Sequence, residues 1–109
     1  MIVKEFIELK KKQVSFYVKE FNAKRIPYSE LNLFLWDTLE EWTQVNLAQD
    51  EPYTETERVF WHLIHLLSYW SEDKLLSDQY LKDEMLLCIE YFEFEGEGYF
   101  PFECIGIRP

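Results

Sequence analysis

Two histidines are the side chains in this sequence with the clearest potential for chemistry. His62 and His65 are its only histidines, and their spacing of three residues places both on one face of a helix. Two imidazoles at that spacing are candidate ligands of a metal ion. A metal site needs further ligands, however, and Arg58 on the same face would repel a cation. We therefore predict no metal site, and we keep a metal-binding helical bundle that uses His62 and His65 as a third hypothesis for the function.

The sequence gives weaker signals for a catalytic nucleophile or a phosphate-binding loop. Cys88 and Cys104 have a spacing that matches no metal or redox motif, so we expect both as small apolar core residues with free thiols. No serine or cysteine stands in the sequence context of a nucleophile elbow, and no glycine-rich loop precedes a helix. The chain has 21 acidic residues, so no single pair of carboxylates stands out as acid and base. The sequence predicts a protein that is not an enzyme and needs no cofactor.

Composition indicates a globular protein with an acidic surface. The 109 residues include nine Phe, seven Tyr and four Trp, and the formal net charge is −10. A chain of this length is typical of one domain, so we predict a single helical domain over residues 1–109. The excess of acid argues against binding to nucleic acid, because contacts to phosphate need Lys and Arg.

The charge is distributed unevenly along the chain. Residues 1–26 contain seven bases and three acids, whereas residues 27–109 contain four bases and 18 acids. Either the basic first helix packs beside acidic helices, or the acidic remainder faces a basic partner. No run approaches the roughly 18 apolar residues of a membrane span, and charges at Lys4 and Glu5 interrupt any signal peptide. We therefore expect a cytoplasmic protein that does not bind membranes.

Apolar residues at steps of three and four predict four helices. The expected helices run over about residues 3–22, 29–45 and 55–70, and from Asp73 or Ser77 to Tyr91. Lys10 interrupts the apolar stripe of the first helix. The third helix has the clearest start, because Thr54 and Glu57 have the spacing of a capping box.

The C-terminal region has a different pattern. The three glycines are Gly96, Gly98 and Gly106, and the apolar residues 99–105 between them are expected to be extended and packed. The predicted fold is all-α: an antiparallel bundle of about four helices, closed by an ordered apolar C-terminal extended tail. The alternative is an α+β fold, in which residues 90–95 and 99–105 form a small C-terminal hairpin.

Tryptophans beside acidic residues predict a surface for a protein partner. Trp36 neighbours Asp37, and Trp42 follows Glu40 and Glu41. Exposed aromatic rings with acids around them are plausible anchors for a basic protein, so these five residues are the predicted partner-binding site. Trp61, opposite the apolar stripe of the third helix, is expected to add to the exposed aromatics.

In fold class and charge the chain is similar to small acidic immunity proteins, which cap basic nuclease toxins. That resemblance implies an inhibitor or immunity-type protein, and an adaptor for a basic partner fits the same surface. The first hypothesis is therefore a small acidic protein-binding domain without enzymatic activity. The second is a structural homo-oligomer, such as a homodimer, in which the aromatic residues serve self-association.

Overall fold

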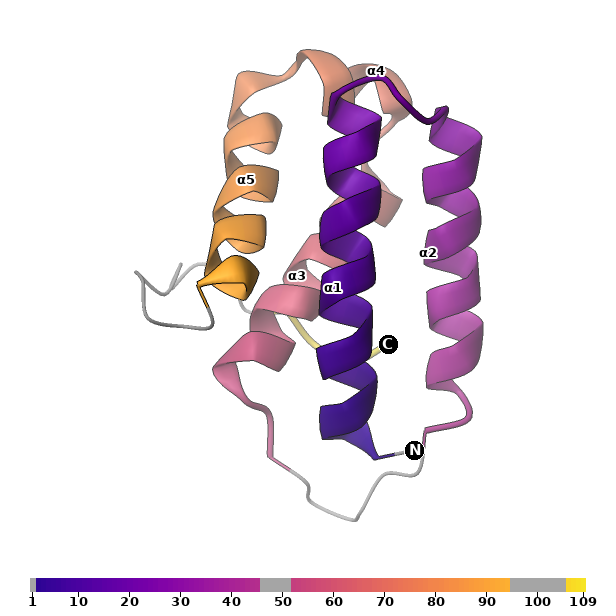
Figure 1. Cartoon of the computed structure of the whole chain (residues 1–109), viewed down its shortest axis with the longest axis vertical. Coiled ribbons are helices and arrows are strands. Elements are labelled where there is room, and N and C mark those ends of the chain that lie inside the picture. Colours follow the sequence, from indigo (N-terminus) through magenta and orange to yellow (C-terminus); the bar gives the residue numbers. More distant parts are fainter. Residues whose placement is uncertain (1, 46–51, 95–105) are drawn as a thin grey trace. The chain divides into compact units, whose positions relative to one another are not determined.

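All regular structure in the described part of the chain is helical. A computed structural model describes residues 2–45, 52–94 and 106–109 (Figure 1). These residues contain five helices and no strand: α1 (Val3–Asn22), α2 (Tyr28–Trp42), α3 (Glu55–Tyr69), α4 (Glu72–Ser77) and α5 (Gln79–Glu93). The predicted all-α helical bundle is confirmed. The alternative hairpin is wrong for residues 90–93, which belong to α5, and residues 95–105 lie outside the described residues.

The chain divides into two compact units. The first comprises Met1–Thr54 together with Pro109, and the second comprises Glu55–Arg108. The single domain expected over residues 1–109 stays a prediction. In the described part of the chain, no helix combines the length and the hydropathy needed to cross a bilayer.

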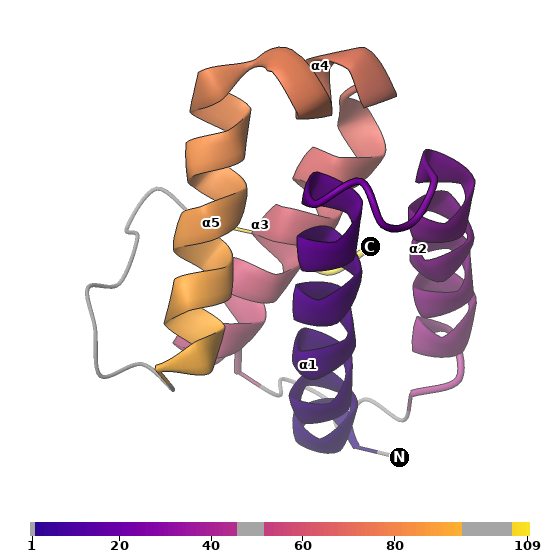
Figure 2. The same cartoon turned by 45° about the horizontal axis from the view of Figure 1, so that its top comes forward.

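The first unit is built on the antiparallel pair of α1 and α2, which lie side by side (Figures 1 and 2). Aromatic contacts show the register. Near the start of α1, Phe6 packs on Trp42 at the end of α2, with ring centroids 5.4 Å apart. Near the end of α1, Phe21 packs on Tyr28 at the start of α2, at 6.0 Å. The apolar stripe predicted for α1 therefore does face a partner helix.

The turn between α1 and α2 is made without glycine. Lys24 has a φ of 60°, in the left-handed region that glycine usually occupies at a helix C-terminus. The N–H of Arg25 donates to the carbonyl of Glu20 at 2.9 Å, and the N–H of Lys24 donates to that of Phe21 at 3.0 Å. These two bonds satisfy carbonyl groups that the end of α1 leaves open, and Pro27 then fixes the entry into α2.

In the second unit, α3 and α5 are antiparallel and α4 links them (Figure 2). The hydroxyl of Tyr91, late in α5, donates to Glu55 at the start of α3 at 3.3 Å. Further along α3, Nε2 of His62 lies 3.3 Å from Oε2 of Glu84. The core of this unit is aliphatic and aromatic. Its fully buried side chains include Phe60, Trp61, Leu63, Ile64, Leu67, Leu75 and Met85.

The predicted fourth helix is two helices. Ser71 caps α4 by accepting from the N–H of Lys74, and Asp78 caps α5 by accepting from the N–H of Leu81 at 3.1 Å. The two alternative starts weighed in the sequence therefore lie close to two real helix starts. A short polar side chain at each N-cap satisfies a backbone N–H that the helix leaves open.

Residues 106–108 lie against α3, and Gly106 makes the closest approach. Its N–H donates to the carbonyl of Arg58 at 3.1 Å. A Cβ at this position would stand 2.5 Å from the Arg58 carbonyl oxygen and would also clash with the backbone nitrogen of His62. Only glycine lets the C-terminal segment reach the α3 backbone this closely.

Candidate functional site

An open groove of about 430 Å³ lies between the N-terminal half of α1 and the C-terminal half of α2. One wall carries carboxylates from α2, and the other carries mainly apolar side chains from α1. The lining residues are Phe6, Leu9, Lys10, Asp37, Glu40, Glu41, Gln44 and Val45. Positions 37, 40 and 41 share one face of α2 because they follow the helical repeat, and Gln44 lies in the turn just after the helix. The structure thus brings together the three acids that the sequence assigned to a partner-binding surface.

Glu41 has a structural partner inside the first unit. Lys10 is buried on the apolar stripe of α1, and its ammonium group pairs with the carboxylate of Glu41. Lys10 Nζ also donates to Gln13 at 3.0 Å and lies 5.7 Å from the centre of the Phe34 ring. A buried ammonium needs such partners because burial removes its hydration. Glu41 therefore neutralises Lys10, which leaves less of its charge for a partner.

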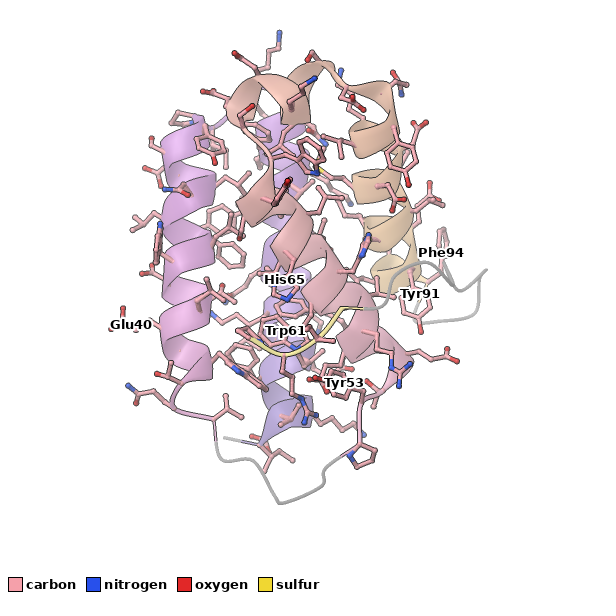
Figure 3. All side chains as sticks on the ribbon, turned by 180° about the vertical axis from the view of Figure 1, so that it is seen from behind. Glu40, Tyr53, Trp61, His65, Tyr91 and Phe94 are labelled. Atoms are coloured by element: carbon pink, nitrogen blue, oxygen red, sulfur yellow. The ribbon has the colours of Figure 1, made fainter. Side chains whose placement is uncertain are left out.

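Asp37 and Glu40 are the acids that face outward. Both are exposed, and among the described residues no Lys, Arg or His forms an ion pair with either. Glu40 points outward from α2 (Figure 3). Their negative charge is directed at solvent, where it can attract a cation.

The three tryptophans of the sequence prediction divide into one exposed and two buried rings. Trp36 is 65% exposed, one residue before Asp37 and one turn before Glu40. Trp42 is buried against Phe6, so it belongs to the core of the first unit rather than to the surface. Trp61 is fully buried, and the expectation that it is exposed was wrong. Trp36 is thus the aromatic side chain placed to contact a partner.

The two histidines make different contacts. His62 faces Glu84 on α5, whereas Nε2 of the exposed His65 lies 2.7 Å from the backbone carbonyl oxygen of Ile107. Among the described residues, no group of three or more His, Cys, Asp or Glu side chains is arranged to hold a metal ion. The pair that the sequence placed on one helix face serves contacts within the second unit.

The sequence predicted Glu57 only as part of a capping box, whereas α3 buries its carboxylate. Glu57 is 1% exposed, and its two oxygens accept from Arg108, at 2.6 Å from Nε and 2.9 Å from Nη2. The indole N–H of Trp61 donates to the same carboxylate at 3.0 Å. The C-terminal segment therefore crosses α3 close to Trp61 and His65 (Figure 3). The capping-box motif pointed to Glu57, but nothing local in the sequence pointed to Arg108.

Two further titratable groups lie in the second unit. Cys88 is buried and forms no disulfide bond with a described residue, as expected, and Cys104 lies outside the described residues. Burial raises the pKa of the Tyr91 phenol above its ordinary value of 10.0, and the nearby charge of Glu55 acts in the same direction against an opposing hydrogen bond from Thr56. Neither group lines the groove between α1 and α2.

Comparison with protein-family models, curated proteins and solved structures gives no match to this chain.

Proposed function

We propose that this protein is a small acidic binding domain, without enzymatic activity, that recognises a basic protein partner through α2. The observation that carries the proposal is the face formed by Asp37 and Glu40 beside the groove, with the exposed ring of Trp36 one turn away. Outward-facing carboxylates attract a basic surface over a distance, and an exposed tryptophan supplies contact area once the surfaces meet. An inhibitor, an immunity-type protein and an adaptor all fit this description.

A cytoplasmic location belongs to the same proposal. Cys88 forms no disulfide bond with a described residue, and reduced cysteines are usual in proteins of reducing compartments. The net charge of −10 fits a partner of opposite charge and disfavours nucleic acid, whose phosphates would be repelled.

A second candidate function is self-association. Leu33 and Trp36 lie three residues apart on α2 and are 56% and 65% exposed. Together they form a small apolar strip that a second copy of the chain could cover. Sedimentation distinguishes the candidates, because an apolar dimer persists at high salt, whereas attraction between opposite charges is screened.

The direct test is a comparative capture experiment with the full chain from a lysate of the source cells. The bait is immobilised as the parent, as Asp37→Asn/Glu40→Gln, and as the control Asp83→Asn/Glu90→Gln. The control removes the same two charges from exposed positions on α5, outside the groove. We expect a basic protein that is retained by the parent and the control, is lost with the α2 variant, and elutes at salt above about 300 mM.

Association kinetics with the captured protein give the second half of the test. The Asp37→Asn/Glu40→Gln variant should slow association and flatten its salt dependence, since charges at the rim act mainly by steering. Trp36→Ala should instead speed dissociation. If the ring is a central anchor, the binding free energy should weaken by about 2 kcal/mol. The proposal is contradicted if no basic protein is retained and the chain forms a dimer that persists at high salt but is absent in the Trp36→Ala variant. That outcome favours self-association.

A further inference from the structure

The second unit has its own groove, which the proposed α2 surface does not use. It is open, has a volume of about 500 Å³, and lies between the C-terminal half of α3 and the first turns of α5. The residues that line it and matter here are Tyr69, Trp70, Asp78, Tyr80 and Glu84. Aromatic rings and carboxylates thus surround one hollow.

The aromatic rings are unusually exposed. Tyr69 is 78% exposed, Tyr80 is 66% exposed and Trp70 is 38% exposed. The rings of Tyr69 and Trp70 meet edge to face, with centroids 4.9 Å apart and planes at 81°, so they present two surfaces at nearly a right angle. The face of an aromatic ring carries negative electrostatic potential, which attracts cations.

The groove is lined by two carboxylates and two histidines. Asp78 caps α5 through one carboxylate oxygen, and Oε2 of Glu84 lies 3.3 Å from Nε2 of His62. None of the described residues that line the groove is a lysine or an arginine. Residues 55–108 as a whole contain 12 acids and four bases. The Asp and Glu side chains that line the groove, and the excess of acids in residues 55–108, therefore favour a cationic occupant.

We propose that this groove binds an arginine side chain of the partner protein, an inference that rests on the proposed function. A guanidinium group is planar, so it stacks on an aromatic ring while its N–H groups donate to carboxylates. A lysine ammonium is a more strongly hydrated point charge and stacks less well. Three exposed rings and two carboxylates, Asp78 at the N-cap of α5 and Glu84 within α5, match the guanidinium better.

A defined peptide tests the site without knowledge of the partner. The full chain, labelled with ¹⁵N, is titrated with acetyl-Gly-Arg-Gly-amide while the indole N–H signal of Trp70 is followed by NMR. Trp70→Phe assigns that signal among the four tryptophans. The matched peptide carries citrulline, which has the shape of arginine without its charge. We expect a saturable shift with arginine and an affinity about tenfold weaker with citrulline.

Two charge variants localise the binding. Asp78→Asn/Glu84→Gln removes both carboxylates of the groove, and Asn caps a helix as well as Asp does, so α5 keeps its start. The control is Asp83→Asn/Glu90→Gln, which removes the same number of charges from α5 outside the groove. We expect about a tenfold loss of affinity for the arginine peptide in the first pair and less than about twofold in the second.

The aromatic contribution has its own matched pair. Tyr80→Leu removes a ring that lines the groove, and Phe94→Leu removes a similarly exposed ring at the end of α5, outside it. We expect about a fivefold loss of affinity with Tyr80→Leu and no measurable loss with Phe94→Leu. Thermal unfolding of each variant shows that the comparison is made between folded proteins.

Four results overturn the inference: no saturable shift of Trp70, equal binding of the citrulline peptide, an equal loss in both charge pairs, or tighter binding of tetramethylammonium or a lysine peptide. The last would indicate an ammonium site instead. Failure here is distinct from failure of the proposed function. If a basic protein is captured and is lost only with Asp37→Asn/Glu40→Gln, the proposed function stands even when the arginine peptide does not bind. If the arginine peptide binds but no basic protein is captured, the groove is an arginine site and the proposed function fails.

Discussion

The two units each bury a charged side chain on a helix, and they stabilise it differently. In the first unit, the buried Lys10 pairs with Glu41, whose side chain is 53% exposed and so keeps much of its contact with water. In the second, the buried Glu57 is held by two N–H groups of Arg108 and by the indole of Trp61. The ionic partner of Lys10 is thus open to solvent, whereas the partners of Glu57 are themselves largely buried.

The units also differ in how well their other buried polar groups are satisfied. The hydroxyl of Thr38 on α2 is buried and has no hydrogen-bond partner among the described residues. In the second unit the buried phenol of Tyr91 reaches Glu55. An unsatisfied buried polar group costs free energy, and a satisfied group loses free energy when its partner is removed. Removing the Thr38 hydroxyl should therefore stabilise the protein, whereas removing a partner of Glu57 or Tyr91 should destabilise it.

The largest effect is expected for Arg108→Ala. It leaves the carboxylate of Glu57 buried without its cation, which should lower the free energy of unfolding by about 3 kcal/mol. Urea unfolding of the full chain measures it. Glu57→Gln added to Arg108→Ala should restore part of the loss, because a neutral amide still accepts from Trp61. A loss below about 1 kcal/mol would show that the network is no stronger than a surface ion pair.

The second-largest loss of stability is expected for Gly106→Ala. The added methyl group meets backbone atoms of Arg58 and Trp61 at 2.5 Å, and backbone cannot move aside as a side chain can. The C-terminal segment must shift, which weakens the bond of Gly106 to Arg58, so we expect a loss of roughly 2 kcal/mol. Hydrogen exchange at the Gly106 amide gives a local measurement. Unchanged protection of that amide in the alanine variant would contradict the close approach.

Much of this arrangement could be predicted from sequence, because it depends on neighbours in the chain. The bounds of α1 were predicted to the residue, and α3 begins at Glu55 as its N-terminal motif indicated. The acids of α2 gather at one groove for the same reason, since a helix places residues three and four apart on one face.

The rest depends on contacts between distant residues. A helical wheel places Trp61 opposite the apolar stripe of α3, and no local pattern indicates that Gly106 and Arg108 cover that side of the helix. The same holds for Lys10: its place on an apolar stripe required a partner, but periodicity could not identify Glu41. Tyr80 lies off the apolar stripe of α5, a signal that could have marked the second groove.

In the first unit, Glu41→Gln tests the ion pair between the buried Lys10 and the half-exposed Glu41. The buried ammonium of Lys10 loses its ionic partner but keeps Gln13 and the Phe34 ring, so we expect a loss of about 1 kcal/mol. Glu40→Gln is the matched control, because it removes the adjacent exposed charge and should change stability by less than about 0.5 kcal/mol. Equal effects of the two substitutions would remove the distinction between the paired Glu41 and the outward-facing Glu40.

Thr38→Val should stabilise the protein. Valine has nearly the shape of threonine and removes the buried hydroxyl, so we expect a gain of about 0.5–1 kcal/mol. Thr43→Val is the control with the opposite sign, because the Thr43 hydroxyl is exposed and donates to the carbonyl of Glu40 at 2.6 Å. A loss of stability with Thr38→Val would mean that the hydroxyl is satisfied after all, and the contrast between the two units would narrow.

The smallest effect is expected for Tyr91→Phe, and it depends on pH. Burial raises the pKa of Tyr91, so the folded protein holds the phenolic proton more tightly than the unfolded chain does. The resulting stabilisation is complete below the unfolded pKa of about 10 and is lost as the pH rises above it.

At pH 8, therefore, Tyr91→Phe should cost about 0.5 kcal/mol through the lost hydrogen bond to Glu55. Above pH 10 the parent should lose stability faster than the variant, so the difference between them should shrink. Tyr69→Phe is the matched control, because it removes the hydroxyl of an exposed ring, and its unfolding curve should follow that of the parent. Parallel curves for the parent and Tyr91→Phe would show that the phenol of Tyr91 gains nothing from burial beside Glu55.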